Sequence, residues 1–174
     1  MIVVVTGPIA SGKSTVAQEL ALQLSRADVP VAVIDLDQVH GALTAGGPIS
    51  ESDAWTMARR QAANRADVLA RDGVTVVIAE GSFNLPADRF AFADVLQASD
   101  GMLYVTLRVS LDEALERAQR DPTRGRSRDP RFLREHFAAR RDVLADVPAT
   151  DLVIDTEQMT APAAAATIRR RLRL

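Results

Sequence analysis

The sequence predicts an α/β fold of three layers, with helices covering both faces of a parallel β-sheet. Five short apolar runs rich in β-branched residues alternate with helical patterns from one end of the chain to the other. Such runs are typical of strands buried on both faces of a parallel sheet. The 174 residues contain no internal repeat or linker and are enough to bury one core. We therefore expect one domain, residues 1–174, built from five strand–helix units.

The expected strands follow in order, each next to a turn or loop signal. The first leads directly into a glycine-rich loop, and Pro30 precedes the second. Asp72-Gly73 and Asp100-Gly101 are turn signals before the third and the fourth. The five runs span residues 2–5, 31–34, 75–79, 102–107 and 152–154.

Helical patterns fill the stretches between these runs. The first spans residues 13 to about 24, and the second, 53–71, carries an apolar stripe. Ser110 opens a capping-box pattern for a helix to about residue 120. Asp129-Pro130 supplies a cap and a first-turn proline for a helix to about residue 144. The same signals at 160–162 begin a last helix that ends near residue 172.

The most specific motif is G-x-x-x-x-G-K-S, between the first strand and the first helix. Its glycines let successive backbone N–H groups converge on phosphate oxygens, and the helix N-terminus adds a favourable potential. Lys13 is the only lysine beside twenty arginines, and its compact ammonium can reach β- and γ-phosphates. Ser14 can offer its hydroxyl to Mg²⁺. The expected nucleotide-phosphate site comprises Gly7, Ala10, Ser11, Gly12, Lys13, Ser14 and Thr15.

Two aspartates, Asp35 and Asp37, follow the second strand, where it should emerge into a loop. Ligands of open parallel sheets bind beyond the carboxyl ends of the strands, and alternation would place both carboxylates on one side. Phosphoryl transfer needs a carboxylate that takes the proton of the acceptor hydroxyl, and a means of holding Mg²⁺. We assign Asp37 as the base and Asp35 to the water shell of Mg²⁺, with the reverse assignment open. The alternative for either residue is a cap on the following helix.

Through the segments GPIASGKST and DLDQVH the chain resembles the small P-loop kinases, which include shikimate kinase, gluconate kinase and chloramphenicol phosphotransferase. The resemblance implies a P-loop NTPase fold whose five-stranded parallel sheet has the order 2-3-1-4-5. It also implies a substrate-binding segment at about residues 37–71 and a lid at about 120–131. Shikimate kinases carry three glycines after the third strand, whereas this chain reads Ala79-Glu80-Gly81, which argues against shikimate as substrate.

Four further residues are candidates for substrate binding. Glu80 follows the third strand, where it could bind a water of Mg²⁺ or a polar substrate group, or simply face solvent. Trp55, the only tryptophan, could form a flat wall for a substrate ring, although its helical stripe favours the core. His40 is a candidate hydrogen-bonding partner of the substrate. Arg59 could bind an anionic substrate, or form a solvated helix face together with Arg60.

Nine of the twenty arginines lie between residues 117 and 141. The segment RDPTRGRSRDPRF is rich in Gly, Pro and Asp, which predicts a loop between two helices. Because it follows the fourth strand, where the small kinases keep a lid, we expect its arginines to close over the transferring phosphoryl group. Arg120 is assigned to catalysis, Arg124 to the nucleotide and Arg128 to the substrate. The alternative is a solvated run of charges.

The nucleotide base is expected against Arg117. In the family that the chain resembles, the end of the fifth strand contacts the adenine largely through its backbone, which here corresponds to Asp155 and Thr156. His136, on the helix after the lid, is expected to be structural.

Composition narrows the classes of protein and partner. The absence of cysteine excludes disulfides and thiolate chemistry, and a net charge of −2 gives no general attraction to nucleic acid. No apolar run approaches the length of a membrane span, and the first residues lack a basic leader region. We expect a cytoplasmic monomer or homodimer with neither a membrane nor a nucleic acid as partner.

These features predict a Mg²⁺-dependent kinase that moves the γ-phosphoryl group of ATP or GTP to a hydroxyl of a small molecule. An antibiotic acceptor, as in a resistance enzyme, is favoured over a metabolite of the shikimate or gluconate type. A polynucleotide 5′-hydroxyl kinase is the other alternative. A GTPase switch is excluded because its N-K-x-D motif needs a second lysine. An AAA-type motor is disfavoured by the length of the chain.

Overall fold

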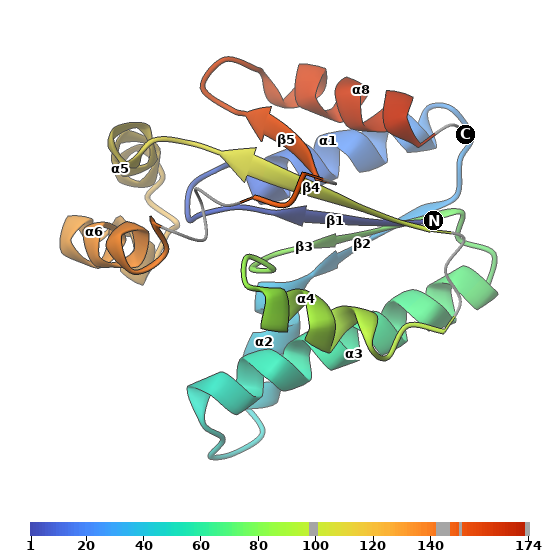
Figure 1. Cartoon of the computed structure of the whole chain (residues 1–174), viewed down its shortest axis with the longest axis horizontal. Coiled ribbons are helices and arrows are strands. Elements are labelled where there is room, and N and C mark those ends of the chain that lie inside the picture. Colours follow the sequence, from blue (N-terminus) through green and yellow to red (C-terminus); the bar gives the residue numbers. More distant parts are fainter. Residues whose placement is uncertain (98–100, 142–146, 150, 173–174) are drawn as a thin grey trace.

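The computed structural model describes residues 1–97, 101–141, 147–149 and 151–172. All five predicted strands are present, and they pair in parallel in the order β2-β3-β1-β4-β5 (Figure 1). The predicted fold class and sheet order are therefore confirmed. The strands are β1 (Ile2–Thr6), β2 (Val31–Asp35), β3 (Val76–Glu80), β4 (Met102–Arg108) and β5 (Leu152–Asp155).

The helices begin where the capping signals predict. The side chains of Ser110, Asp129 and Thr160 each accept a hydrogen bond from a backbone N–H in the first turn of the following helix. The helices are α1 (Lys13–Ser25), α2 (Leu36–Thr44), α3 (Glu51–Arg71), α4 (Pro86–Ala93), α5 (Leu111–Arg120), α6 (Pro130–Ala139) and α8 (Ala161–Arg171), with a short 3₁₀ helix η1 (Arg126–Arg128).

Two helices, α2 and α4, have no counterpart in the sequence prediction. Both are short, 9 and 8 residues, and each follows a strand end within a few residues, so neither presents a long periodic stripe. The predicted helix from residue 130 to about 144 is described as α6 to residue 139, and residues 142–144 of that prediction lie outside the described part of the chain.

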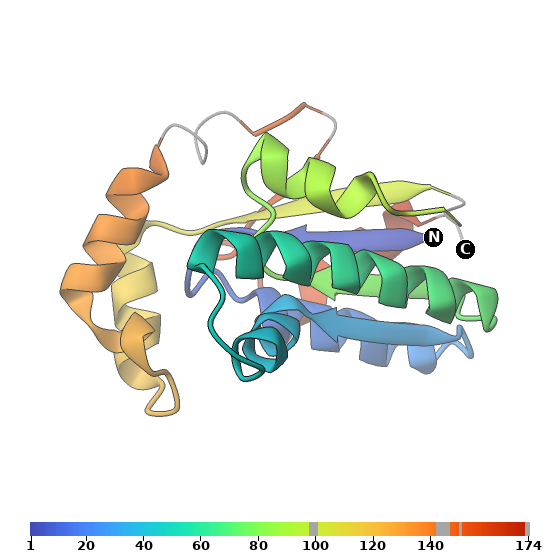
Figure 2. The same ribbon diagram turned by 90° about the horizontal axis from the view of Figure 1, so that it is seen from below.

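The sheet is covered on both faces. Helices α1 and α8 lie on one face, while α3 and α4 lie on the other (Figure 1). Seen from below, α3 runs along the sheet beside α4 (Figure 2). Helices α5 and α6 stand beyond the carboxyl ends of the strands, whereas the chain termini lie at the opposite end. The three-layer arrangement thus leaves the carboxyl edge of the sheet between the helical layers and the α5–α6 pair.

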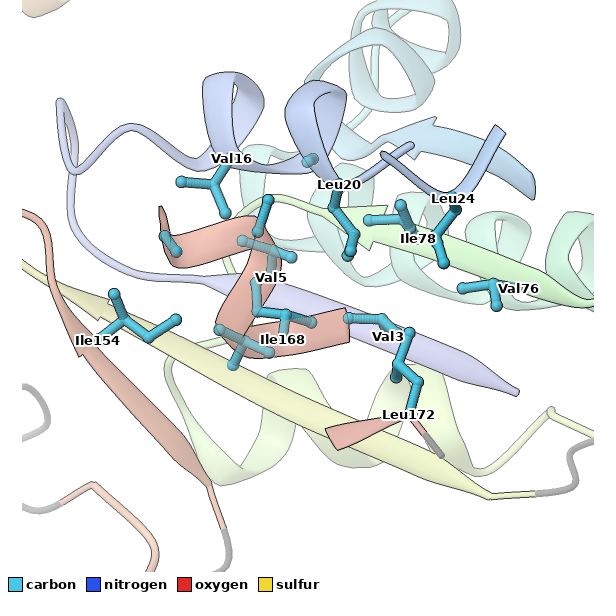
Figure 3. Close-up of a cluster of buried hydrophobic side chains, with 14 of the residues drawn as sticks. Val3, Val5, Val16, Leu20, Leu24, Val76, Ile78, Ile154, Ile168 and Leu172 are labelled. Atoms are coloured by element: carbon cyan, nitrogen blue, oxygen red, sulfur yellow. The ribbon is translucent and has the colours of Figure 1, made fainter. Parts of the chain in front are cut away.

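Each face of the sheet has its own core cluster. Strand residues alternate between the clusters, because successive side chains of a strand point to opposite faces. Figure 3 shows the cluster between the sheet and helices α1 and α8, which includes Val3, Val5, Val16, Leu20, Leu24, Val76, Ile78, Ile154, Ile168 and Leu172. The opposite cluster packs against α3 and includes Ile2, Val4, Ala58, Ala62, Val77, Phe83 and Phe92.

A third, smaller cluster joins α5 and α6 to the loop after β1. Ala114, Ala118 and Leu133 are fully buried there, and Ala10 is 4% exposed. The α5–α6 pair therefore rests on this loop through apolar contacts. Among the described helices, none combines the length and the apolar character that crossing a membrane requires.

Candidate functional site

Two glycines shape the phosphate loop between β1 and α1. Gly7 has a φ of 148°, and a Cβ there would lie 2.6 Å from the carbonyl oxygen of Leu107. Gly12, with a φ of 87°, is the N-cap of α1 and supplies no side-chain cap. The first N–H groups of α1 are therefore left for another acceptor, which is the arrangement that binds phosphate.

Lys13 and Ser14 both have partners within the protein. The Lys13 Nζ donates hydrogen bonds to the carbonyl oxygens of Gly7 at 3.2 Å and Pro8 at 3.0 Å. Burial lowers the pKa of Lys13, although the negative charges of Glu80 and Asp37 oppose this. A hydrogen bond links the Ser14 side chain to the carboxylate of Glu80. Both residues are thus held in place by contacts within the protein.

Helix α2 begins at Leu36, so the loop expected after β2 is wrong. Asp35 is the N-cap: its Oδ1 accepts hydrogen bonds from the backbone N–H of Asp37 at 2.8 Å and of Gln38 at 3.2 Å. Its Oδ2 accepts one from the Gln38 amide at 3.1 Å. The cap considered for one of the two aspartates is therefore made by Asp35. Because the backbone turns helical at this point, the alternation argument does not extend to Asp37.

Asp37 lies in the first turn of α2 and faces the cavity beside the phosphate loop. Burial raises its pKa, while the charge of Lys13 lowers it and that of Asp35 raises it further. Gly81 brings the next loop close to this turn, because a Cβ there would lie 2.5 Å from the Cβ of Leu36. The close approach places the first turn of α2 beside the end of β3.

Glu80 is the last residue of β3 and is only 5% exposed. It lies in register between Val5 of β1 and Asp35 of β2. A solvent-facing strand end is therefore wrong for this residue. Burial raises its pKa, the hydrogen bond with Ser14 and the charge of Lys13 lower it, and the two aspartates raise it. Glu80 thus sits beneath the phosphate loop, next to the residue expected to hold the metal.

Trp55 and His40 form one wall of the cavity. Their rings stack with centroids 3.9 Å apart and planes 14° from parallel. The Trp55 Nε1 donates to Glu51 Oε1 at 2.9 Å, which fixes the indole. Trp55 also packs against the core cluster below α3. It therefore both borders the core and lines the cavity, which were the two alternatives for this residue.

Arg59 belongs to the protein interior, with 7% exposure. Its Nε and Nη2 donate to the carbonyl oxygen of Ser82 at 3.1 and 3.0 Å, and Nη2 lies 3.0 Å from Asp88. A solvated face is therefore wrong for Arg59, although the side chain of Arg60 is half-exposed. The guanidinium lines the cavity, but its hydrogen bonds are to the loop between β3 and α4.

Only one of the three arginines assigned to the lid faces the cavity. Arg124 lines it and pairs with Asp121 at 3.1 Å. Arg120 is 71% exposed and pairs with Glu116 on its own helix. Arg128 donates to the carbonyl oxygen of Gln119 at 3.4 Å and does not line the cavity. The reason is helical geometry: positions on α5 and η1 that turn away from the phosphate loop point to solvent.

Five other residues of this region also line the cavity: Arg126, Ser127, Phe132, His136 and Arg140. Arg126 lies over the ring of Phe132, 4.4 Å from its centroid. Burial, together with the positive charges of Arg140 and Lys13, lowers the pKa of His136 to about 4. His136 therefore borders the site, whereas the sequence alone suggested only a structural role. Positions 132, 136 and 140 recur with helical spacing, which was the available signal.

Arg117 connects the phosphate loop to the end of β5. It donates to Thr156 Oγ1 at 2.9 Å, to the Thr156 carbonyl at 2.7 Å and to the Ala10 carbonyl at 3.4 Å. Asp155 accepts from the N–H of Glu157 at 2.9 Å. Arg117, Asp155 and Thr156 thus lie together outside the cavity beside the phosphate loop, and their role at the nucleotide base stays a prediction.

The cavity unites these parts in a volume of about 550 Å³ at the carboxyl edge of the sheet. The phosphate loop contributes Gly7, Ala10, Gly12, Lys13 and Ser14, whereas Ser11 and Thr15 do not line it. The opposite wall holds Asp37, His40, Trp55, Arg59, Glu80, Ser82 and Asn84, and the lid side holds Arg124, Arg126, His136 and Arg140. Ser82 and Asn84 were not predicted as site residues, because they lie in a short loop without a recognisable motif.

The donor set fits Mg²⁺. A serine hydroxyl, a buried carboxylate and a neighbouring aspartate lie together at Ser14, Glu80 and Asp35. Mg²⁺ keeps several waters and takes few protein ligands when nucleotide phosphates supply the rest. The described residues contain no group of three or more His, Asp or Glu side chains that would hold a metal on their own. A metal at this place would therefore be shared with the nucleotide.

The fold and the phosphate cradle define a P-loop protein of the small-kinase type. Residues 2–147 match the AAA domain family, and the chain belongs to it. The resemblance to the small P-loop kinases is confirmed. The family is defined by this domain, and membership in it does not imply motor activity, which the length of the chain argues against.

Three relatives illustrate the similarity. The chain is 33% identical over 117 residues to an adenylyl-sulfate kinase of Chloroflexus aurantiacus, covering 67% of this chain and 60% of that protein. A gluconokinase from Sinorhizobium meliloti 1021 has a TM-score of 0.63 at 21% identity, covering 98% of this chain and 94% of that one. The Deinococcus radiodurans tunicamycin resistance protein has a TM-score of 0.67 at 18% identity, covering 99% and 95%. At these identities the structures show a shared fold.

Proposed function

We propose that this protein is a Mg²⁺-dependent phosphotransferase that moves the γ-phosphoryl group of ATP or GTP to a hydroxyl of a small molecule. The observation that carries the proposal is that one cavity holds Lys13, Ser14, Asp37 and Arg124. A phosphate cradle alone is common to many nucleotide-binding proteins. A partly buried carboxylate facing that cradle across an open space is what transfer to an acceptor requires.

Each of these residues has a chemical role in the transfer. Lys13 would hold the β- and γ-phosphates, and Ser14, Asp35 and Glu80 would hold Mg²⁺ and its waters, which would supply positive charge to the phosphates. The acceptor oxygen forms a bond to the γ-phosphorus as the bond to the β–γ bridging oxygen breaks, and the acceptor proton passes to Asp37. A raised pKa suits Asp37 for this, because a base is most effective when its pKa approaches the working pH.

Arg124 supplies positive charge from the lid side. It is close enough to Lys13 for its charge to lower the lysine's pKa. A triphosphate between the two cations would relieve their repulsion, and charge on the transferring group would be stabilised from both sides. Arg126 and Arg140 face the same space from η1 and α6.

We favour an antibiotic or a comparable small hydroxylated compound as acceptor. An aromatic wall of Trp55 and His40 offers a flat apolar surface, which suits a ring-bearing molecule. One structural neighbour is a tunicamycin resistance protein. A second candidate acceptor is a nucleotide of the adenylyl-sulfate type, because the relative at 33% identity is named adenylyl-sulfate kinase.

A nucleotide-consumption screen tests the proposal. Purified protein, Mg²⁺ and either ATP or GTP would be incubated with tunicamycin, chloramphenicol, gluconate, adenylyl sulfate and a 5′-hydroxyl oligonucleotide. Phosphorus NMR would identify the phosphorylated product. We expect transfer to one class of acceptor that disappears without Mg²⁺ and in Asp37→Asn. Product formation that persists in Asp37→Asn, or nucleotide consumption without any phosphorylated acceptor, would contradict the proposal.

A further inference from the structure

The loop between β3 and α4 contains a chain of hydrogen bonds that the phosphate site does not use. The backbone N–H of Phe83 donates to the Thr6 hydroxyl at 2.9 Å, and the Thr6 hydroxyl donates to Asn84 Oδ1 at 3.0 Å. The Asn84 Nδ2 donates in turn to the Ser82 hydroxyl at 3.3 Å. Thr6, fully buried at the end of β1, thus joins the strand that precedes the phosphate loop to this second loop.

This chain fixes which way the Asn84 amide points. The Phe83 N–H can only donate, so the Thr6 oxygen accepts from it. The Thr6 proton then needs an acceptor in a fully buried place, and Asn84 supplies it with its carbonyl oxygen. The reverse amide orientation would leave that hydroxyl proton without a partner. Asn84 therefore presents its NH₂ group, and not its oxygen, on the other side.

One N–H of that group is left over. Among the described residues, the Asn84 Nδ2 has a single hydrogen-bond partner, Ser82, although it carries two protons. Both side chains line the cavity, and both residues are partly exposed. The Ser82 hydroxyl accepts from Asn84 and keeps its own proton to donate. The loop thus directs two neutral donors at the space that holds Asp37.

Two arginine side chains hold the backbone of this loop. Arg59 donates twice to the carbonyl oxygen of Ser82, and Arg89 Nε donates to that of Phe83 at 3.1 Å. Two buried or partly buried guanidinium groups therefore hold the backbone on both sides of the cavity-facing side chains. Donors held in this way lose little freedom when they bind a ligand, which is the condition for strong discrimination.

We propose that Asn84, together with Ser82, is the specificity-determining pair for the acceptor, and that the acceptor carries a second, hydrogen-bond-accepting oxygen besides the hydroxyl that is phosphorylated. This inference rests on the proposed function. The sheet order places the pair on the far side of Glu80 from Asp37, since β3 lies between β2 and β1. One hydroxyl of the acceptor faces Asp37, and a further oxygen of the same molecule faces Asn84. Polyhydroxylated or carbonyl-bearing compounds meet this condition, whereas simple alcohols do not.

The test compares Asn84→Asp, Asn84→Ala and the control Asn64→Asp. The aspartate at position 84 keeps an acceptor for Thr6 and removes the donors. Asn64 is the only other asparagine, lies exposed on α3 and does not line the cavity, so its substitution adds the same charge elsewhere. The probes are the acceptor found in the screen, with D-glucose and adenosine as fixed compounds, each beside its deoxy analogues. KM for the acceptor, KM for the nucleotide and binding by saturation-transfer NMR are measured for each variant.

For the wild type we expect at least one deoxy analogue to lose about 10- to 100-fold in kcat/KM, as befits a lost hydrogen bond in a built site. Both Asn84 variants should abolish that discrimination and raise the acceptor KM by a similar factor, with nucleotide KM within about 2-fold, whereas Asn64→Asp behaves like wild type. Retained discrimination in folded Asn84 variants would overturn the inference and leave the proposed function intact. Binding that depends on Asn84 without phosphoryl transfer would support the inference and overturn the proposed function. If no probe is bound or phosphorylated, both are overturned.

Discussion

A partly buried histidine in α6 makes the folded protein sensitive to acid. Burial, the charge of Arg140 and the charge of Lys13 together lower the pKa of His136 from 6.5 to about 4. The unfolded chain therefore binds a proton at this residue over a pH range in which the folded protein does not. Stability from His136 is fully present above the unfolded pKa, and it is lost as the pH falls from about 6.5 through the folded value of about 4.

The size of the effect follows from the two pKa values. With 6.5 in the unfolded chain and about 4 in the folded protein, the wild type loses about 2 to 3 kcal/mol of unfolding free energy between pH 7.5 and pH 4.5 through this group. The variant His136→Leu removes the titrating imidazole and replaces it with an apolar side chain of similar size. Carboxylates elsewhere titrate equally in both proteins, so the difference between them isolates His136.

Urea unfolding of both proteins at the two pH values measures this difference. We expect the wild type to lose about 2 to 3 kcal/mol more than His136→Leu on acidification. Because the chain has only two histidines, proton NMR can follow the His136 ring directly. In Arg140→Gln the titration should move to higher pH, since one of its causes is gone. A His136 ring that titrates near 6.5, or equal acid sensitivity of the two proteins, would refute this account of the α6 environment.

Four further predictions concern the cavity. Lys13→Ala should abolish phosphoryl transfer and weaken nucleotide binding, and Lys13→Arg should restore little of either, because a planar fork fits the cradle badly; isothermal titration and turnover check both. Asp37→Asn should keep nucleotide affinity and lose about 10²-fold or more in turnover, so near-normal kcat would remove its role as base. Glu80→Gln should raise the melting temperature at neutral pH and change it little near pH 4. The reason is that a carboxyl whose pKa is raised by folding destabilises the folded protein at any pH above the ordinary pKa of that carboxyl. Scanning calorimetry at both pH values measures the difference. Arg124→Ala should lower kcat far more than it lowers ground-state nucleotide affinity. The matched control is Arg120→Ala, because Arg120 is exposed on the same segment. Equal kinetics for the two variants would mean that the arginines of this segment are solvated charges without a role in transfer.

The sequence predicts the sheet well because its signals are local. Each strand contains a run of mostly apolar residues, and each of the caps at Ser110, Asp129 and Thr160 uses a side chain next to the helix it begins. The phosphate loop is equally local, since its glycines and lysine are adjacent in the chain. Helix α2 was not predicted, because Asp35 was assigned to metal binding, whereas its carboxylate caps that helix.

The rest of the cavity depends on contacts between distant parts of the chain. Arg59 and Ser82 are separated by 23 residues, and Thr6 and Asn84 by 78, so no spacing rule joins them. The arginine-rich segment shows the same limit: composition indicated that arginines gather near the phosphate loop, but the direction of each depends on the turn of α5, η1 and α6. Arg124 and Arg126 face inward, whereas Arg120 and Arg128 face outward.

The single lysine gives the phosphate loop a property that no other part of the chain shares. A protease that cleaves only after lysine has one site in this protein, between Lys13 and Ser14, in the first turn of α1. That bond cannot enter a protease while Lys13 is bound to Gly7 and Pro8 and the helix is intact. The rate of this one cut therefore reports how often the nucleotide cradle opens, whether by local opening or by unfolding of the whole molecule.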